Sequence, residues 1–190
     1  MRVNADAMTL YAVTDRTWVE DTTLMDQVKE ALEGGITFLQ LREKHLSKEE
    51  FIKEAREMKE LSKEYKVPFV INDNIKVALE VDADGVHIGQ DDMSVEEARK
   101  LLGEDKIIGV SAHNVKEALK AQKGGADYLG VGAVCATSTK KDANVVSKEE
   151  IKKIKEAVDI PIVAIGGIKK DNIDALTAVS YTHLTLPTIA

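Results

Sequence analysis

The sequence predicts an α/β fold, a parallel (β/α)8 barrel that is incomplete, with about seven βα units followed by a tail that does not match the pattern. Short runs rich in β-branched residues alternate with longer amphipathic runs rich in Lys and Glu, which is typical of a parallel sheet covered by helices. The first and seventh apolar runs begin at residues 9 and 161, or about 25 residues per unit, the scale of such a barrel. Small-residue turns such as Gly34-Gly35 and Gly124-Gly125 recur before strands and indicate a weak internal repeat.

The strands are expected at the seven apolar runs, in chain order Thr9–Thr14, Ile36–Leu41, Pro68–Asn72, Gly85–Ile88, Ile107–Ser111, Tyr128–Gly132 and Pro161–Ile165. The helices are expected near residues 22–33, 47–65, 74–80, 94–102, 114–122, 147–158 and 170–178. Several of these helices begin at a residue that can cap the first turn, namely Ser47, Ser94, Asn114 or Ser147. Ser47 and Ser94 also have Glu50 and Glu97 three residues later, which is the spacing of a capping box.

The eighth unit is where the pattern breaks. No charged side chain occurs from Ala175 to Ala190, although 31% of the whole chain is charged. We therefore expect a barrel domain over residues 1–178 and an unrelated tail over residues 179–190. Without an eighth strand, the first strand around Leu10–Val13 and the seventh around Ile162–Ile165 are expected to keep unpaired backbone groups. The alternation of Thr or His with Leu over Thr182–Leu186 allows a makeshift strand in this gap.

Composition excludes several classes of function. The 26 Lys and Arg against 33 Asp and Glu give a net charge of −7 without a basic block, which argues against nucleic-acid binding. No apolar run approaches the roughly 20 residues of a membrane helix, and the first residues lack a signal-peptide core. The single cysteine, Cys135, cannot form an internal disulfide. We therefore expect a cytoplasmic protein with small-molecule partners, no nucleic acid and no membrane; the sequence does not define its oligomeric state.

Two aspartates follow neighbouring strands, at the strand ends where active sites form in parallel barrels. Asp73 follows the third expected strand and Asp92 follows the fourth. A carboxylate pair without a cluster of His and Cys suits Mg²⁺ better than Zn²⁺. The alternative is that Asp73 caps the following helix and that Asp92 lies in a solvated acidic turn. Occurring together at strand ends, they predict a Mg²⁺ site.

Cationic and hydrogen-bonding side chains follow other strands of the same expected rim. In this acidic chain, Arg42, Lys44 and Lys140 near a metal are what a polyphosphate requires, although ordinary surface residues are the alternative. Hydrogen-bond donors are expected from Asn72, Thr137 and Thr139. The pair Gly166-Gly167 allows backbone amides to approach a phosphate closely.

The histidines and the cysteine do not indicate nucleophilic catalysis. His87 lies inside an apolar run and is expected to be a core residue with its hydrogen bonds satisfied. His45, His113 and Cys135 show no arrangement of a nucleophile and its base.

Six motifs follow one another along the expected strand ends. They are Gln-Leu-Arg-Glu-Lys at 40–44, Asn-Asp at 72–73, Asp-Gly-Val-His-Ile-Gly-Gln-Asp-Asp at 84–92, Gly-Val-Ser at 109–111, Thr-Ser-Thr-Lys-Lys-Asp at 137–142 and Ile-Gly-Gly-Ile at 165–168. Together, from about residue 9 to about residue 178, the chain resembles the thiamine phosphate synthase family. The resemblance implies a TIM-type barrel and a transferase that joins 4-amino-2-methyl-5-(diphosphooxymethyl)pyrimidine to a thiazole phosphate and releases pyrophosphate.

The resemblance also implies a role for each motif residue. It assigns Mg²⁺ to Asp73 and Asp92, and the thiazole phosphate to Thr137, Ser138, Thr139 and Gly167. It assigns the pyrimidine diphosphate to Gln40, Leu41, Arg42, Glu43, Lys44, Asn72, Ser111 and Lys140. Catalysis falls to Arg42, Lys44 and Lys140, which would stabilise charge on the leaving pyrophosphate in a dissociative displacement that needs no protein nucleophile. The Gly-rich eighth-strand segment of the family, which binds the thiazole phosphate, has no match around Ser180.

Two other functions stay open on the sequence. One is a thiazole tautomerase-like isomerase, which would not need the diphosphate machinery. The other is an inactive truncated remnant that only binds Mg-diphosphate, because the last unit is missing. The joint presence of Arg42, Lys44, Asp73, Asp92 and Lys140 favours the synthase over the tautomerase.

Overall fold

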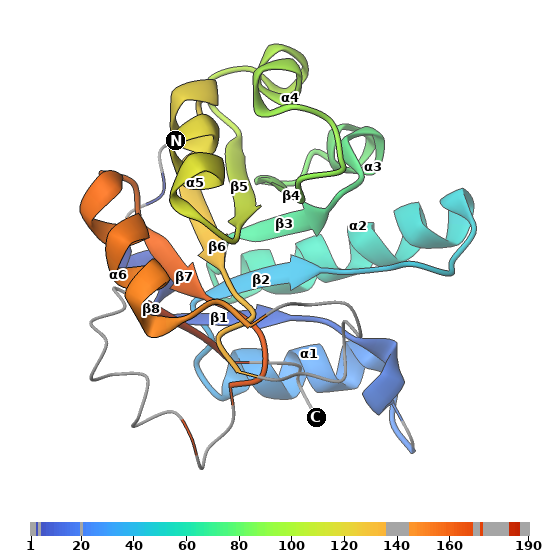
Figure 1. Cartoon of the computed structure of the whole chain (residues 1–190). Coiled ribbons are helices and arrows are strands. Elements are labelled where there is room, and N and C mark those ends of the chain that lie inside the picture. The colour runs from blue at the N-terminus through green and yellow to red at the C-terminus, as the bar shows by residue number, and fades with distance from the viewer. Residues whose placement is uncertain are drawn as a thin grey trace.

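The apolar runs form parallel strands that close into a barrel in the computed structural model (Figure 1). The structure describes residues 3, 5–19, 21–135, 145–168, 172 and 183–186. Within these residues the ring follows the chain order from β1 to β8, and every neighbouring pair is parallel. The strands are β1 (Leu10–Val13), β2 (Phe38–Leu41), β3 (Phe69–Asn72), β4 (Gly85–Ile88), β5 (Ile107–Ala112), β6 (Tyr128–Val131), β7 (Ile162–Ala164) and β8 (His183–Leu186).

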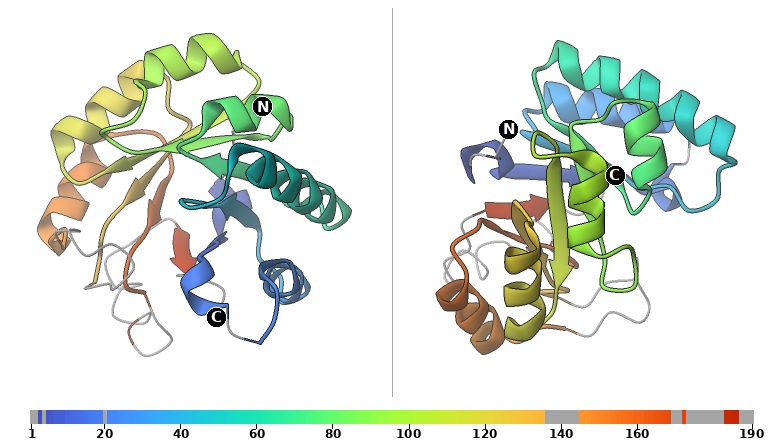
Figure 2. Two further views of the ribbon diagram at one scale, coloured as in Figure 1. Left: turned by 90° about the vertical axis from the view of Figure 1, so that its right-hand side faces the viewer. Right: turned by 90° about the horizontal axis from the view of Figure 1, so that it is seen from above.

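Helices connect the strands and cover the outside of the ring (Figure 2). They are α1 (Leu24–Glu33), α2 (Lys48–Glu64), α3 (Ile75–Glu80), α4 (Val95–Leu102), α5 (Val115–Gly124) and α6 (Lys148–Ala157), with two short 3-10 helices, η1 (Ala5–Met8) and η2 (Arg16–Trp18). The seven predicted strands and the first six predicted helices are confirmed to within two residues at each end. The helix predicted at 170–178 lies outside the described residues except for Asn172, and the two 3-10 helices were not predicted.

The predicted capping residues explain where the helices begin. The Ser47 hydroxyl accepts a hydrogen bond from the Glu50 N–H at 3.3 Å, while the Glu50 carboxylate accepts from the Ser47 N–H at 3.0 Å. This is a complete capping box, which satisfies two donors of the first turn. Ser94, Asn114 and Ser147 each accept a hydrogen bond from the third backbone N–H of their helix, so all four predicted caps are confirmed.

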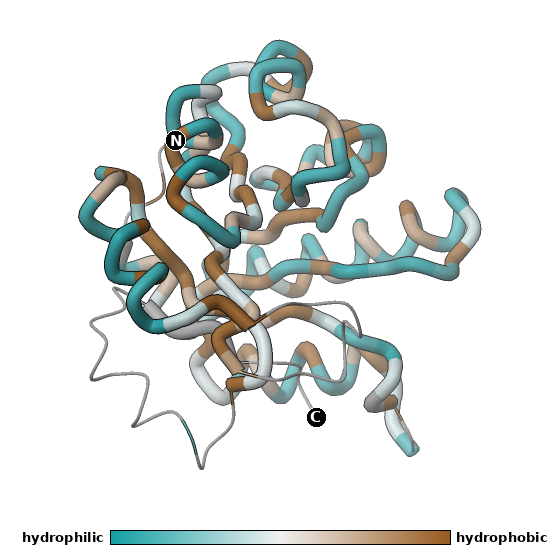
Figure 3. Tube along the Cα trace, viewed as in Figure 1, coloured by the Kyte–Doolittle hydropathy of each residue, from teal (hydrophilic) through white to brown (hydrophobic). Residues whose placement is uncertain are grey.

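Strand side chains alternate between two apolar layers. Figure 3 shows the apolar stretches of the chain along the strands of the ring. On β2, Leu39 and Leu41 join the layer between strands and helices, whereas Phe38 joins the barrel interior. There the Phe38 ring stacks on Tyr11 with centroids 4.6 Å apart, and Tyr128 packs edge-on against Phe38. Gly109 makes room for Tyr128, because a Cβ at this position would lie 2.0 Å from its Cζ atom. The interior is therefore aromatic and tightly filled.

The eighth strand comes from the segment expected to be a tail. β8 pairs with β1 through Leu10 and Leu184, and with β7 through Ala164 and Leu184. The expectation that the first and seventh strands keep unpaired backbone groups is therefore wrong. The alternating segment Thr182–Leu186, which the sequence marked as a makeshift strand, supplies the missing partner at His183–Leu186 because parallel pairing needs backbone groups and not particular side chains.

In the part of the chain that the structure describes, no helix is long and apolar enough to span a membrane.

Candidate active site

Asp73 and Asp92 lie together at the carboxyl ends of β3 and β4. Asp73 directly follows β3 and adopts a left-handed backbone with φ of 59°, where its N–H donates to the His87 carbonyl at 2.8 Å. The Asp92 carboxylate turns back and accepts the Gly89 N–H at 2.7 Å. A hydrogen bond joins the two carboxyl groups, and the Lys44 ammonium pairs with Asp73 from the end of β2.

The two carboxyl groups have pKa values that move in opposite directions. Burial raises the pKa of Asp73, but the hydrogen bonds from Lys44 and Asp92 outweigh burial and lower it overall. Burial also raises the pKa of Asp92, and the neighbouring Asp73 charge adds to the increase despite the Gly89 N–H. Of the two carboxyl groups, Asp92 therefore holds a proton more readily than Asp73.

The alternative for Asp73 does not match the structure, whereas Asp92 is exposed in the acidic turn after β4, as its alternative expected. Asn74, and not Asp73, caps α3, because the Asn74 side chain accepts the Val77 N–H at 3.0 Å. Ser94 caps α4, which leaves Asp92 free to converge with Asp73. Among the described residues no group of three or more His, Cys, Asp or Glu could hold a metal. Two carboxylates still fit Mg²⁺, which often takes one or two from protein and fills its octahedron with water and phosphate oxygens.

The Arg42 side chain points to the end of β1. Its guanidinium lies 4.0 Å from the Asp15 carboxylate, and 19% of the side chain is exposed. Its backbone N–H donates to the Thr14 hydroxyl at 2.9 Å, which fixes the chain as it leaves β2. The Asp15 carboxylate also accepts the Thr17 N–H at 3.0 Å at the start of η2. Arg42 therefore projects from a hydrogen-bonded part of the rim while its charge stays partly open to a ligand.

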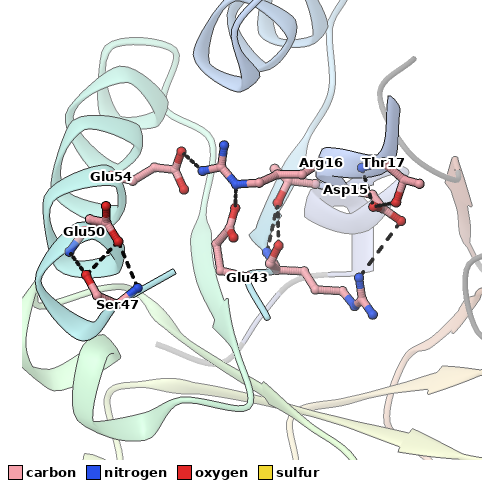
Figure 4. A network of polar contacts seen from close by, with 9 residues as sticks. Asp15, Arg16, Thr17, Glu43, Ser47, Glu50 and Glu54 are labelled. Carbon is pink, nitrogen blue, oxygen red and sulfur yellow. Dashed lines mark hydrogen bonds and ion pairs between the residues drawn. The ribbon is translucent and has the colours of Figure 1, made fainter. Parts of the chain in front are cut away.

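Glu43 belongs to a second carboxylate pair around Arg16 (Figure 4). The Arg16 Nε atom lies 2.7 Å from a Glu43 oxygen, and another guanidinium nitrogen pairs with Glu54 of α2. Arg16 and Glu54 were not predicted from the sequence. Arg16 follows the first strand, so the rule used for the later strands would have selected it; Glu54 lies within a charged helix and gives no such signal.

Burial and the neighbouring Glu54 carboxylate raise the pKa of Glu43 to about 7 against the opposing effect of Arg16. In the unfolded chain this carboxyl group has its ordinary pKa of 4.5. Between pH 4.5 and about pH 7, the folded state therefore holds a proton that the unfolded state has lost. Stability from this group is therefore fully present below the unfolded pKa and is lost as the pH rises through about 7. We expect Glu43→Gln to stabilise the fold relative to the parent chain by about 1–3 kcal/mol more at pH 8 than at pH 5.

Thermal melts between pH 5 and pH 8 measure this difference. Glu57→Gln, an exposed change on α2, is the matched control and should follow the parent chain at every pH. A Glu43→Gln curve parallel to that of the parent would contradict the raised pKa.

Gln40 and Ser111 are tied to a buried set of polar side chains inside the barrel. The Gln40 amide donates to the Tyr11 hydroxyl at 2.7 Å, and the Ser111 hydroxyl lies 3.0 Å from His87 Nε2. His87 Nδ1 lies 3.0 Å from the Tyr128 hydroxyl. The prediction that His87 is a core residue with its hydrogen bonds satisfied is thus confirmed, and its partners connect it to two predicted binding residues.

The remaining predicted residues are placed as follows. Asn72 ends β3 and is half-buried, while the Leu41 side chain is buried in the layer between strands and helices. Only the backbone of Leu41 is therefore available to a ligand at the rim. Gly167 follows β7 with φ of 71°, in the left-handed region that favours glycine, and its carbonyl accepts from the Asn172 amide at 2.9 Å. Residues predicted after β6, namely Thr137, Ser138, Thr139 and Lys140, lie outside the described residues.

Comparison with known proteins identifies the family of this chain. The family model for thiamine monophosphate synthase matches residues 10–183. The thiamine-phosphate synthase of Clostridium acetobutylicum is 54% identical over 163 residues, covering 86% of this chain and 77% of the relative. That of Methanobrevibacter smithii is 50% identical over 181 residues, covering 91% of this chain and 86% of the relative.

Solved structures show the same relationship in three dimensions. The thiamine phosphate pyrophosphorylase from Pyrococcus furiosus superposes with a TM-score of 0.87 at 40% identity, covering 96% of this chain and 87% of that structure. An N-acetylmannosamine-6-phosphate 2-epimerase from Clostridium perfringens has a TM-score of 0.71 at 14% identity and shows the fold alone. By sequence and by structure, this chain is a transferase that belongs to the thiamine monophosphate synthase family.

Proposed function

We propose that this chain condenses 4-amino-2-methyl-5-(diphosphooxymethyl)pyrimidine with a thiazole phosphate to give thiamine phosphate and pyrophosphate. The observation that carries the proposal is the convergence of Lys44, Asp73 and Asp92 at one rim, in a chain of this family. A diphosphate is strongly negative and binds together with a divalent cation, so it suits a rim that offers both a cationic side chain and a pair of carboxylates. An isomerase acting on a thiazole phosphate alone would need neither the carboxylate pair nor the cations.

Asp73 and Asp92 would hold Mg²⁺, and when bound it supplies positive charge against the diphosphate oxygens. The donor set supports this assignment, because two carboxylates leave room for water and phosphate oxygens. Lys44 pairs with Asp73 in the structure. With a diphosphate in place, the same ammonium would be available to a phosphate oxygen, and a bound cation would balance the charge of Asp73.

The displacement breaks the bond between the pyrimidine methylene carbon and the diphosphate oxygen, and the electron pair leaves with pyrophosphate. The aminopyrimidine ring stabilises the methylene cation, and the thiazole nitrogen then attacks that carbon. Arg42, Lys44 and Lys140 act by holding the negative charge of the leaving group as it develops. No side chain has to donate electrons, so catalysis is a matter of position and charge.

The other predicted residues bind and orient the two substrates. Gln40, Asn72, Ser111 and the backbone of Leu41 hold the pyrimidine diphosphate, while Glu43 anchors this rim through Arg16. The thiazole phosphate is bound by Gly167 and by the residues after β6, Thr137, Ser138 and Thr139. The left-handed turn at Gly167 supports this role because it brings the backbone close to the rim without a side chain.

Two measurements on the purified chain test the proposal. Calorimetric titration with Mg-pyrophosphate should show binding, and incubation with both substrates and Mg²⁺ should form thiamine phosphate and pyrophosphate. Binding without condensation would instead identify a remnant that only holds Mg-diphosphate. Isomerisation of the thiazole phosphate without Mg-pyrophosphate binding would identify a tautomerase.

We also propose a cytoplasmic location, and a native barrel domain over residues 1–178 with residues 179–190 as a segment of different origin. The uncharged composition of the last residues supports the second proposal. An independent read of the gene after residue 178 tests it. A matching continuation would overturn the division.

A further inference from the structure

Five side chains from five strands form a continuous hydrogen-bonded relay through the barrel interior. We call this set the interior relay: Gln40 of β2, Tyr11 of β1, Tyr128 of β6, His87 of β4 and Ser111 of β5. Its successive contacts measure 2.7, 2.7, 3.0 and 3.0 Å. All five residues are buried, with at most 6% of any of them exposed. Barrel interiors are usually filled by branched apolar side chains, so a polar relay needs a reason beyond filling space.

The hydrogen bonds of the relay all run in one direction from donor to acceptor, and the Gln40 end determines that direction. The Gln40 Nε2 group has hydrogens but no acceptor lone pair, so Tyr11 must accept from it. Burial raises the pKa of both phenols well above the ordinary value, so each keeps one proton to donate. Tyr11 then donates to Tyr128, and the Tyr128 proton goes to His87 Nδ1.

The direction continues through the imidazole ring. Because His87 Nδ1 accepts, the neutral ring carries its proton on Nε2 and donates to the Ser111 hydroxyl oxygen. A doubly protonated ring would leave one buried phenol proton without an acceptor in the relay, which is costly. The Ser111 hydroxyl proton is consequently directed away from the relay. At the other end, the Gln40 side-chain carbonyl oxygen is directed away from the relay, because the amide nitrogen of the same side chain donates to Tyr11.

We propose that the interior relay fixes Gln40 as a hydrogen-bond acceptor and Ser111 as a hydrogen-bond donor toward the substrate, and thereby selects a 4-aminopyrimidine. This inference rests on the proposed function. An aminopyrimidine offers an amine that donates and ring nitrogens that accept, which is the complementary pattern. Tyr11, Tyr128 and His87 are positioning residues, since they act on the substrate through Gln40 and Ser111.

The backbone around Ser111 supports this assignment. The Gln90 amide, which follows β4, donates to the Ser111 carbonyl at 2.7 Å. Gly130 lies beside the ring of His87, where a Cβ would approach Cε1 to 2.9 Å. Both contacts hold the end of the relay in one geometry, as required of groups that orient a substrate.

The first test reads the histidine tautomer by nitrogen-15 NMR on the full chain, with His87→Asn used to assign the signal. The expected result is a proton on His87 Nε2. Gln40→Glu places an acceptor where the donor was, so every hydrogen bond in the relay should reverse and the proton should move to Nδ1. A parent ring protonated on Nδ1, or no change in Gln40→Glu, would overturn the proposal. Because this readout needs no activity, it can fail or succeed independently of the proposed function.

The second test separates positioning from mere packing. Tyr128→Phe removes one hydroxyl and keeps the ring, so the KM for the pyrimidine diphosphate should rise by roughly 10- to 100-fold while the KM for the thiazole phosphate is unchanged. Tyr65→Phe, which changes an exposed tyrosine at the carboxyl end of α2, should leave both constants unchanged. If Tyr128→Phe does not fold, Tyr11→Phe interrupts the same relay one step earlier. A folded variant with an unchanged KM for the pyrimidine diphosphate would overturn the proposal.

Discussion

Asp92→Ala is expected to lower Mg²⁺-dependent condensation by at least about 100-fold while the chain still folds. The carboxylate is one of the two that meet beside Lys44, and its removal leaves Asp73 paired with Lys44. A divalent cation would then have a single protein carboxylate, already neutralised. Rates measured across a Mg²⁺ titration, with a thermal melt of each protein, check this expectation.

Asp91→Ala is the matched control, because Asp91 is an exposed aspartate next in the chain and is not part of the pair. Asp73→Ala should reproduce the loss of Asp92→Ala. Full activity of either variant at ordinary Mg²⁺ would remove the metal assignment. A loss in Asp91→Ala of the same size would mean that the whole acidic turn, and not the pair, is required.

Arg99→Ala is expected to reduce the free energy of unfolding by about 3–5 kcal/mol, the largest structural effect that we predict. The guanidinium of this α4 residue donates to the carbonyls of Gly103, Lys106 and Gly125 at 3.0, 2.6 and 2.7 Å. It also pairs with Asp127 at 2.6 Å, and only 12% and 9% of the two side chains are exposed. Its loss leaves three carbonyls without this donor, and a largely buried carboxylate that keeps the Ile108 N–H but has lost its cation.

Denaturant unfolding measures this effect, and Lys100→Ala is the control because it removes an adjacent but exposed cation from the same helix. That control should change the free energy by less than about 0.5 kcal/mol. A similar small change in Arg99→Ala would show that water replaces the guanidinium at no cost. Activity per folded molecule should survive in Arg99→Ala, since these contacts hold the amino-terminal ends of β5 and β6, away from the rim.

The strand order and the helix starts were predictable because each depends on local signals. An apolar run bounded by small residues is read as a strand wherever it occurs, and Ser47 with Glu50 marks a helix start within four residues of chain. The meeting of Asp73 and Asp92 was also predictable, because parallel strands bring their carboxyl ends to one rim. Because of this rule, two residues that are far apart along the chain can be expected to lie in contact.

The interior relay was not predictable for a physical reason. Both faces of a strand in a parallel barrel are buried, so Tyr11 and Tyr128 read as ordinary members of apolar runs. Which face each residue occupies, and which residues meet across the ring, depend on the register of non-local pairs such as Gly109 with Tyr128. Glu54 was missed similarly, because a charged residue in an amphipathic helix is ordinarily solvated and only the fold places Arg16 against it.

The pairing of β1 with β8 has a consequence for the order in which the ring assembles. Every other pair joins consecutive strands, whereas Leu10 and Leu184 meet from distant parts of the chain. Closing so long a loop costs more conformational entropy than forming any neighbouring pair, so this seam should form last during folding. By the same reasoning it should open first in the native state, and amide hydrogens along the seam should exchange with solvent sooner than those between β4 and β5. The barrel thus behaves as a rolled sheet that is closed at one seam, and β4 and β5 lie opposite that seam in the ring.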